Sequence, residues 1–236
     1  MRLDGIGVRY GLRDPWVLRG VSLDVPAGQL IRAQGGNGGG KSTLLRVVAG
    51  VCSPTRGSVR DRPARRAYVP ERFPAALPFT PHDYLCHLGR IHGLREPAQR
   101  AGELLERFGA AAFARTPLAE LSKGTCQKVA VAQALLGEPE LLVLDEAWTG
   151  LDQDARAELD TAVDERLAGG GTVLFVDHDP ARLAAGPVLR WQVGDGGVAV
   201  TDAEHSSTVR ITLSTESAEL LRELREDPRA RIESVR

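Results

Sequence analysis

A glycine-rich segment near the N-terminus constrains the fold of this 236-residue chain more than any other feature. It lies between an apolar-containing stretch (29–33) and a helix-like run (42–49), and it matches the phosphate-loop pattern G-x-x-x-x-G-K-[ST] without a mismatch. Its residues are Gly35, Gly36, Asn37, Gly38, Gly39, Gly40, Lys41, Ser42 and Thr43. Such glycines let backbone N–H groups point at phosphates, and the following helix presents its positive N-terminus to the same oxygens. The segment therefore predicts a nucleoside triphosphate site, with Lys41 between the β- and γ-phosphates and the Ser42 hydroxyl on Mg²⁺.

The scarcity of lysine in this chain supports that prediction. Only three of the thirty basic residues are lysines, at positions 41, 123 and 128. An arginine fork binds phosphate well, but it does not fit a narrow loop as a compact ammonium does. A lysine retained at position 41 therefore indicates that the site itself requires one.

Length, charge and hydropathy limit the class of protein. A chain of this length can hold one large α/β domain or two small ones, and the early phosphate loop favours one core with insertions. The net charge of −1 gives no general attraction to nucleic acid or to an anionic bilayer. The longest apolar runs (141–144 and 173–176) are far too short to span a bilayer, and the N-terminus lacks the apolar core of a signal peptide. These features predict a soluble, cytosolic protein.

Cysteine and histidine usage gives no clear metal site. The three cysteines are odd in number and unpaired in spacing, which is typical of a reducing compartment. His82, Cys86, His87 and His92 lie close together in sequence, but no second ligand cluster completes a zinc shell. We expect these four residues to occupy ordinary helix surface and core positions.

The hydrophobic pattern predicts an α/β fold. Runs of alternating character at 3–10 and 21–25 predict short strands of an edge sheet. The runs 141–144 and 173–176 are apolar throughout, as expected of parallel strands buried on both faces. Between them lies a one-sided helical pattern with Asp152 placed to cap its start, which completes a βαβ unit. The fold class predicted is a phosphate-loop NTPase core with a mainly parallel sheet, an antiparallel edge sheet and a helical subdomain.

Two adjacent carboxylates extend the prediction from binding to hydrolysis. Asp145 and Glu146 follow the apolar run 141–144, where an open parallel sheet presents its ligand-binding edge. Asp145 can hold Mg²⁺ directly or through water, and Glu146 is placed to orient and deprotonate the attacking water. A solvated sheet edge is the alternative explanation for such a pair, and the phosphate loop disfavours it.

Four further segments are similar to motifs of one known family. They are Leu121-Ser122-Lys123-Gly124-Thr125-Cys126-Gln127, then Gly150-Leu151-Asp152, then His178 after the second apolar run, and Tyr10 upstream of the phosphate loop. Their order and spacing resemble those of the nucleotide-binding subunit of ATP-binding cassette (ABC) transporters, over about residues 1–200. The first segment resembles the signature loop, which separates this family from other phosphate-loop ATPases.

The resemblance implies a site shared between two domains that meet head to tail. Ser122 and Gly124 would contact the γ-phosphate held by the partner, through a hydroxyl, a backbone N–H and a helix N-terminus. His178 would bridge the γ-phosphate and Glu146, and Asp152 would line the dimer seam. The cofactors implied are ATP and Mg²⁺.

Two positions depart from the family pattern. Lys123 replaces the usual second glycine of the signature and adds positive charge near the partner's phosphates, and we expect activity to survive. Glu71 replaces the glutamine after the strand at 68–70, where it can still offer an oxygen to Mg²⁺ but adds a negative charge beside ATP. Tyr10 matches the aromatic that stacks on adenine, although a core position for Tyr10, or stacking by Trp16, is an alternative.

The function implied is that of an ATP-binding and ATP-hydrolysing subunit that powers transport through separate membrane-spanning permease subunits. Two ATP molecules would close the dimer and move permease helices seated beside the helical insertion, and hydrolysis would reopen it. The expected partners are a second ABC ATPase subunit, in a homodimer, and an integral membrane permease, with no nucleic acid. The expected location is cytoplasmic, peripheral on the inner face of the cell membrane. The segment 79–85 resembles exporter-type subunits.

The predicted domain organisation follows from the same comparison. Residues 1–200 form the ABC ATPase domain, with the helical subdomain inserted at about 79–136, and residues 201–236 form a small C-terminal appendage or tail. Two other functions remain open. One is a soluble ABC-type ATPase acting on nucleic acid or the ribosome, although such proteins usually carry two cassettes or long coiled-coil insertions. The other is a non-hydrolysing nucleotide-binding scaffold, against which the intact Asp145, Glu146 and His178 argue.

Overall fold

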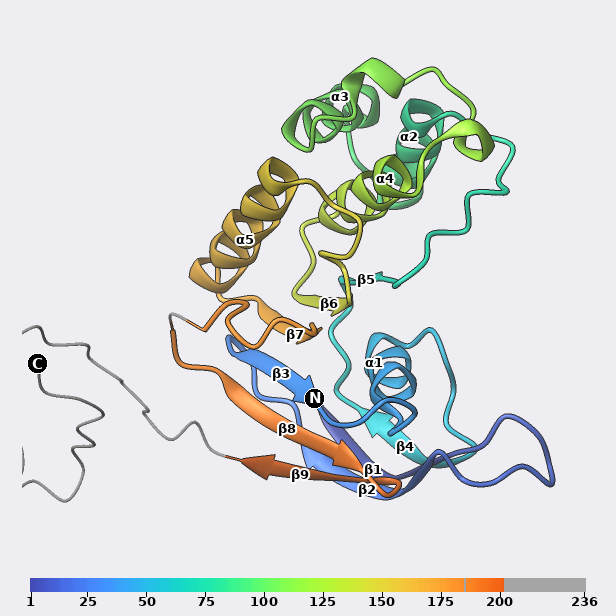
Figure 1. Cartoon of the computed structure of the whole chain (residues 1–236), viewed down its shortest axis with the longest axis vertical. Helices are drawn as coiled ribbons and strands as arrows, with labels where there is room; N and C mark the ends of the chain where they lie inside the picture. The colour runs from blue at the N-terminus through green and yellow to red at the C-terminus, as the bar shows by residue number, and fades with distance from the viewer. Residues whose placement is uncertain (185, 202–236) are drawn as a thin grey trace, which may run out of the picture. The chain divides into compact units, whose positions relative to one another are not determined.

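Two β-sheets organise the part of the chain that the computed structural model describes, which is residues 1–184 and 186–201 (Figure 1). The strands are β1 (Arg2–Val8), β2 (Leu18–Asp24), β3 (Leu30–Gln34), β4 (Arg56–Arg60), β5 (Arg66–Val69), β6 (Leu141–Asp145), β7 (Thr172–Val176), β8 (Leu189–Gly194) and β9 (Gly197–Thr201). The helices are α1 (Lys41–Ala49), α2 (Pro81–Ile91), α3 (Pro97–Arg107), α4 (Lys123–Leu135) and α5 (Gln153–Ala168), with 3₁₀ turns η1 (Ala111–Phe113) and η2 (Leu118–Glu120). The strand and helix patterns predicted beyond residue 201 lie outside the described residues.

The larger sheet is mainly parallel, as predicted. Its strand order is β5-β6-β7-β3-β8-β9, and every neighbouring pair is parallel except β8 with β9. The second sheet is antiparallel and has the order β2-β1-β4. Its strand β1 ends at Val8, earlier than the alternating run predicted. The predicted fold class is confirmed.

The predicted βαβ unit consists of β6, α5 and β7. Alternate residues of β6 enter different cores: Leu142 and Leu144 pack with the helices α2 to α5, whereas Leu141 and Val143 pack with α1 and the antiparallel sheet. Both faces of the strand are therefore buried, which explains why its sequence is apolar throughout. Asp152 caps α5 as predicted, because its Oδ1 accepts a hydrogen bond from Ala155 N at 2.9 Å.

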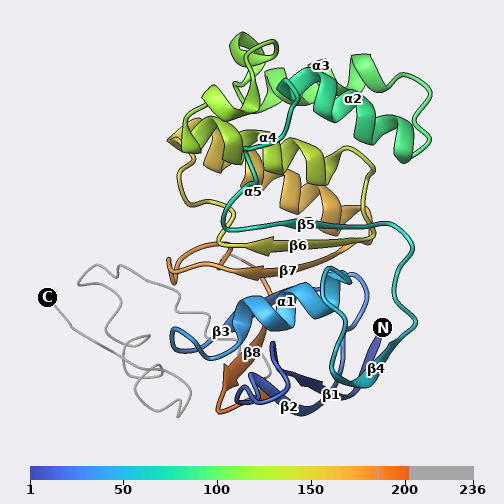
Figure 2. The same ribbon diagram turned by 90° about the vertical axis from the view of Figure 1, so that its right-hand side faces the viewer.

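The helices form layers on the two faces of the larger sheet. Figure 2 shows α1 on one face of strands β5, β6 and β7, and α4 and α5 on the opposite face. Helices α2 and α3 lie next to α4, beyond the sheet. The segment 79–136, all of which is described, contains these three helices, two 3₁₀ turns and no strand.

The histidines and cysteine of α2 occupy ordinary positions. Cys86 is buried with its Sγ 3.6 Å from His82 Nδ1, and the ring of His87 stacks on Phe79 with centroids 5.8 Å apart. Among the described residues, no group of three or more His, Cys, Asp and Glu could hold a metal ion. In the same part of the chain, no helix has the length and apolar character needed to cross a membrane.

Candidate active site

Backbone geometry makes glycine necessary in the phosphate loop. Gly35 has φ of +148°, and a Cβ there would lie 2.0 Å from the carbonyl oxygen of Val193 in β8. Gly40, the N-cap of α1, is left-handed with φ of +97°. Since Gly40 has no side chain to cap the helix, the first N–H groups of α1 remain directed toward the loop, where they can bind an anion.

Lys41 lies over the same loop. Its Nζ donates to the carbonyl oxygens of Gly35 at 2.9 Å and Gly36 at 3.0 Å. These bonds hold the ammonium group beside the N-terminus of α1. The charge of Lys41 and the positive end of the helix dipole therefore lie at the same loop. This arrangement is compatible with the predicted binding of phosphate at the loop, which stays a prediction.

Asp145 stands at the centre of a hydrogen-bonded chain between α1, β5 and β6. The carboxylate is almost fully buried; its Oδ1 accepts from Ser42 Oγ at 3.0 Å and its Oδ2 from the Tyr68 hydroxyl at 2.8 Å. Arg46 Nε donates in turn to the Tyr68 oxygen at 3.3 Å. Burial raises the pKa of the Tyr68 hydroxyl well above its ordinary value, so the phenol stays protonated and acts as a donor.

Tyr68 and Arg46 were not predicted as site residues. Arg46 follows Ser42 by four positions on α1, which places both on one face of the helix. Tyr68 reaches Asp145 because β5 and β6 are neighbours, with Tyr68 paired to Val143. The helical spacing is visible in the sequence, but the strand pairing is not.

Glu146 and His178 are brought together at the ends of β6 and β7. His178 Nε2 lies 2.9 Å from Glu146 Oε1, and the imidazole is largely exposed while the carboxylate is mostly covered. Glu146 has a left-handed backbone with φ of +53°, a conformation that a residue other than glycine rarely adopts. Its N–H donates to Val176 O at 3.0 Å, so the end of β7 fixes this strained position.

The signature-like segment forms the start of α4. Ser122 is the N-cap, and its Oγ accepts from Thr125 N at 3.1 Å. Gly124 packs so closely against the loop after β6 that a Cβ would lie 2.6 Å from the carbonyl oxygen of Gly150. The two predicted partner-facing segments are therefore in backbone contact within one chain.

Asp152 is linked to the same helix by an ion pair. Its Oδ2 lies 2.6 Å from Lys128 Nζ, a lysine of α4 that the sequence interpretation did not assign to the site. This hydrogen bond, together with the cap bond from Ala155 N, lowers the pKa of Asp152 below its ordinary value.

The structure favours Tyr10 over Trp16 as the exposed aromatic beside the loop. The Tyr10 hydroxyl lies 2.8 Å from Thr43 Oγ1 in a hydrogen bond, and 62% of the residue is exposed, so Tyr10 is not a core aromatic. The ring of Trp16 makes cation–π contacts with two guanidinium groups: that of Arg9 lies 4.9 Å and that of Arg56 lies 5.0 Å from the ring centroid. Stacking of Tyr10 on a base stays a prediction.

Glu71, a predicted magnesium ligand, lies just beyond the end of β5. Half of its side chain is exposed and its ion-pair partner is Arg72 at 3.8 Å. The buried Gln127 links the neighbouring segments: its Nε2 donates to Pro70 O at 3.3 Å and to Ala147 O at 3.2 Å. Gln127 therefore ties the segment before Glu71 to the segment after Glu146, a role that only its place in the signature-like segment could have suggested.

Comparisons with known proteins agree with this arrangement. Residues 18–149 match the family described as "ABC transporter". The chain is similar to the zinc import ATP-binding protein ZnuC of Cereibacter sphaeroides, with 42% identity over 178 residues, covering 74% of this chain and 70% of the relative. It is 38% identical over 181 residues to ZnuC of Pseudomonas fluorescens, covering 76% and 67%. It is 36% identical over 188 residues to the uncharacterized ABC transporter ATP-binding protein YhaQ of Bacillus subtilis, covering 75% and 62%.

Solved structures show the same fold. An ATP-binding subunit of an ABC transporter superposes with a TM-score of 0.75 at 27% identity, covering 86% of this chain and 89% of that one. A dimeric, post-hydrolysis ATP-binding cassette bound to ADP and Pi superposes with a TM-score of 0.71 at 24% identity, covering 85% and 97%. The relatives with a substrate in their names are import proteins, so they do not support the exporter-type prediction.

Proposed function

This chain belongs to the ABC transporter family, as an ATP-binding and ATP-hydrolysing subunit that powers transport through separate permease subunits, and we propose that two copies of it hydrolyse MgATP in shared sites. One observation carries the proposal: the phosphate loop, the Ser42–Asp145 pair and the Glu146–His178 pair lie at one end of the parallel strands. That end of an open α/β sheet is where ligands bind.

The phosphate loop would hold the nucleotide. Lys41 would exchange its bonds to the carbonyls of Gly35 and Gly36 for the phosphate oxygens, and the N–H groups at the start of α1 would bind the same anion. Tyr10, exposed and bonded to Thr43, would stack on adenine. The remaining loop residues would contribute backbone rather than side chains.

Ser42 and Asp145 fit a magnesium ion. Both offer hard oxygen ligands, and Ser42 Oγ and Asp145 Oδ1 lie 3.0 Å apart. A bound Mg²⁺ supplies positive charge that offsets the negative charge of the transferring phosphoryl group. Glu71, just beyond the end of β5, would offer a further oxygen to the ion and would add a negative charge beside ATP.

Glu146 and His178 would carry out the proton transfer. The carboxylate would accept a proton from the water that attacks the γ-phosphate, and His178 would hold the carboxylate through its 2.9 Å contact while reaching the phosphate itself. The exposed position of the imidazole leaves it accessible to a nucleotide. These roles favour hydrolysis over the alternative of a non-hydrolysing scaffold.

The second copy would complete each site. Subunits of this family dimerise, and in the proposed pair the N-terminus of α4, capped by Ser122, would face the partner's γ-phosphate. Gly124 would bring backbone N–H groups close to that phosphate, and Asp152 would lie at the seam. Because Gly124 packs against Gly150, a shift of the signature-like segment would also move the loop after β6.

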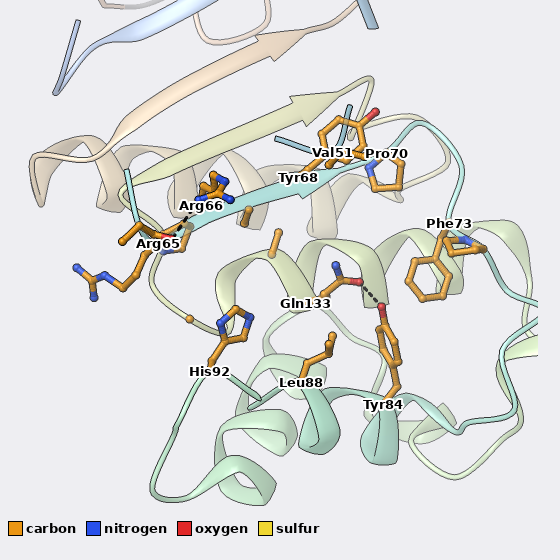
Figure 3. Close-up of a pocket in the computed structure, with 16 residues that line it drawn as sticks. Val51, Arg65, Arg66, Tyr68, Pro70, Phe73, Tyr84, Leu88, His92 and Gln133 are labelled. Atoms are coloured by element: carbon orange, nitrogen blue, oxygen red, sulfur yellow. Dashed lines mark hydrogen bonds between the residues drawn. The ribbon is translucent and has the colours of Figure 1, made fainter. Parts of the chain in front are cut away.

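A cavity beside the helical segment would seat the permease. It has a volume of about 400 Å³ and lies between β5 and helices α2 and α4 (Figure 3). Phe73, Tyr84 and Leu88 line it with apolar surface, and the Tyr84 hydroxyl donates to Gln133 Oε1 at 2.6 Å. A helix of the permease, with apolar side chains to match, is the proposed occupant.

Location and domain division follow from these partners. We place the chain in the cytoplasm, on the inner face of the membrane, because there it would bind the permease. Residues 1–200 would act as the ATPase domain, with the helical subdomain inserted at about 79–136 and the remaining residues as an appendage. The packing of α2 and α3 against α4 supports the inserted unit.

Size-exclusion chromatography with light scattering tests the shared site. The full-length Glu146→Gln variant should be a monomer alone and a dimer with MgATP, because the bound nucleotide is not consumed. A monomer that binds ATP but never dimerises would contradict the two-copy site. Affinity purification that recovers ribosomes or DNA, and no membrane protein, would favour the soluble alternative.

A further inference from the structure

A buried arginine lies beneath the segment that carries His178. We name residues 177–182, which follow β7, the switch segment. Arg32 belongs to the neighbouring strand β3, where it pairs with Phe175, and only 8% of the residue is exposed. Aliphatic residues usually fill such a position in a parallel strand covered on both faces. A guanidinium group there needs a separate explanation.

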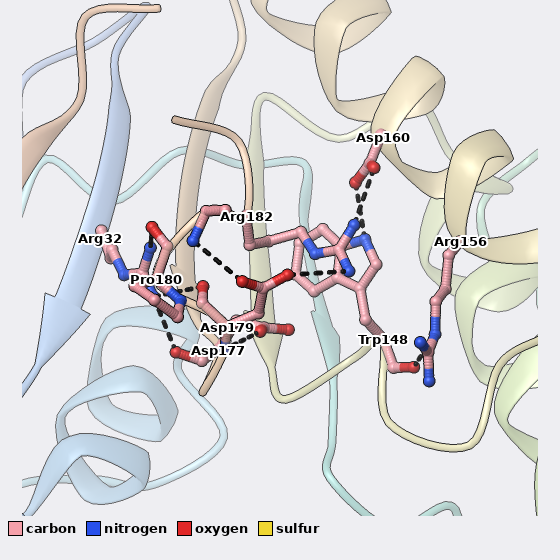
Figure 4. A network of polar contacts seen from close by, with 9 residues as sticks. Arg32, Trp148, Arg156, Asp160, Asp177, Asp179, Pro180 and Arg182 are labelled. Carbon is pink, nitrogen blue, oxygen red and sulfur yellow. Dashed lines mark hydrogen bonds and ion pairs between the residues drawn. The ribbon is translucent and has the colours of Figure 1, made fainter. Parts of the chain in front are cut away.

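The guanidinium of Arg32 holds the backbone on both sides of His178 (Figure 4). Its Nη2 donates to Asp177 O at 3.0 Å and to Asp179 O at 2.7 Å, and its Nη1 donates to Pro180 O at 3.0 Å. The same group lies over the ring of Phe175, 5.5 Å from the centroid. One side chain thus binds three carbonyl groups of the switch segment.

The burial of this cation has an energetic cost. Desolvation lowers the pKa of Arg32, and the carboxylates of Asp177 and Asp179 offset part of that effect. A buried charge is retained in a fold when it is paired and its hydrogen bonds are satisfied. Here the donors satisfy backbone acceptors of the turn after β7, where Asp179 O accepts a second hydrogen bond from Arg182 N at 3.1 Å.

The far end of the switch segment is fixed to α5. Arg182 Nη1 donates to Asp160 Oδ2 at 2.9 Å, and the other oxygen of Asp160 accepts from Trp148 Nε1 at 2.7 Å. Trp148 follows Glu146 by two residues, and its ring lies 5.4 Å from the Arg182 guanidinium. The segments that carry Glu146 and His178 are therefore both bonded to Asp160 of α5, the first through Trp148 and the second through Arg182.

We infer that Arg32 is a positioning residue for ATP hydrolysis, which holds the switch segment so that His178 Nε2 stays on Glu146 Oε1. The inference rests on the proposed role of His178. The Arg32 side chain makes no hydrogen bond to the phosphate loop in the described structure, and it acts through the backbone of Asp177, Asp179 and Pro180. Its removal should affect turnover and leave nucleotide binding unchanged.

Steady-state ATPase kinetics of the full-length chain test this inference. Arg32→Met should lower kcat by about tenfold to a hundredfold, the usual effect of a misplaced catalytic group, with KM for ATP unchanged. Arg62→Met is the matched control, because Arg62 is also partly buried and donates to a backbone carbonyl, that of Val47 at 3.0 Å, but lies at the opposite end of α1 from the phosphate loop. The control should keep the kcat of the unmodified chain.

A double variant separates positioning from general destabilisation. If Arg32 acts through His178, then Arg32→Met combined with His178→Ala should have the kcat of His178→Ala alone. Additive losses would overturn the inference. A His178→Ala variant with unchanged kcat would instead contradict the proposed function, and an Arg32→Met variant with unchanged kcat, beside an impaired His178→Ala, would contradict the inference alone.

Hydrogen exchange gives a readout that does not depend on activity. Amides of the switch segment should exchange faster in Arg32→Met than in the unmodified chain, while those of α1 should not change. Equal exchange in the switch segment would overturn the inference. If Arg32→Met does not fold, Arg32→Lys provides the same tests, because one ammonium cannot reproduce the planar fork, and it should show a smaller loss of kcat with the same dependence on His178.

Discussion

His178 Nε2 lies 2.9 Å from Glu146 Oε1, although 32 positions and a complete helix separate the two residues in the chain. Strand pairing accounts for the contact. Asp145 of β6 is paired with Val176 of β7, so the residues that follow these strands leave the sheet side by side. The pairing of two buried strands thereby sets the geometry of the proposed proton transfer.

Glu146→Gln should lower kcat for ATP hydrolysis by about 10² to 10⁴, the usual contribution of a general base. The amide keeps the shape of the side chain and can still accept a hydrogen bond from His178, so ATP affinity should not fall. Phosphate release from the full-length variant measures the rate, and calorimetry measures the affinity. An unchanged rate would remove Glu146 from the role of base.

Lys41→Ala should weaken ATP binding itself. A charge-assisted hydrogen bond contributes about 1.5 to 3 kcal/mol, so the dissociation constant should rise by about tenfold or more. Lys123→Ala is the control, since Lys123 begins α4 and would face only the nucleotide of a partner subunit. Calorimetry on the monomeric chain should show the loss for position 41 alone, and equal affinities would contradict the placement of the phosphate loop.

Local sequence patterns were sufficient to predict the phosphate loop and the strands of the core. The glycines at 35 and 40 are required by the backbone itself, and the runs 141–144 and 173–176 are apolar because both their faces are buried. Such constraints act over a few neighbouring residues, so they appear directly in the sequence. The fold class and the pairing of the acidic residues with the loop were predicted from them, whereas the family was inferred from the resemblance of further segments, such as 121–127, to its motifs.

Contacts that depend on strand order could not be predicted in the same way. Tyr68 bonds to Asp145 across 77 positions, and it does so only because β5 occupies the edge of the sheet beside β6. The bonds from Arg32 to the switch segment likewise depend on β3 lying next to β7. The sequence shows the two residues of each contact, but it does not show that the strands that carry them are neighbours in the sheet.

Tyr68→Phe should destabilise the fold more than Tyr84→Phe, although each substitution removes one partly buried hydroxyl. The Tyr68 hydroxyl donates to a buried carboxylate, and hydrogen bonds to charged groups contribute about 1.5 to 3 kcal/mol. The Tyr84 hydroxyl donates to the neutral amide of Gln133, where about 0.5 to 1.5 kcal/mol is expected. Urea denaturation gives both free energies of unfolding. Equal losses in the free energy of unfolding would show that the bond to Asp145 stabilises the fold no more than the bond to Gln133.

Gly124→Ala should also lower stability, against the usual preference of helices for alanine. A Cβ at this position would lie 2.6 Å from the carbonyl oxygen of Gly150, so the backbones must separate at a cost of about 1 to 3 kcal/mol. Gly102→Ala, in α3, meets no atom within 4 Å and should be neutral or stabilising by about 0.5 to 1 kcal/mol. A stable Gly124→Ala protein would mean that the loop at Gly150 yields easily.

The Lys128–Asp152 ion pair should make stability depend on pH in the acid range. The hydrogen bond from Lys128 is the main cause of the lowered pKa of Asp152, with the Ala155 N–H as the next contribution. A carboxyl whose pKa is lower in the folded state stabilises the fold above its ordinary pKa of about 3.9. That stabilisation disappears as the pH falls below this value through the folded pKa.

Lys128→Met should therefore reduce the free energy of unfolding at neutral pH, and the difference from the unmodified chain should shrink as the pH falls from about 5 to about 2. The Asp152 side chain is 58% exposed, so the pH-dependent part should stay below about 1 kcal/mol and decrease in high salt. In an Asp152→Asn background the same lysine substitution should have no pH-dependent effect, because no carboxylate remains to titrate. A pH-dependent difference that persists in that background would assign the effect to another acidic group and would leave Asp152 as a helix cap only.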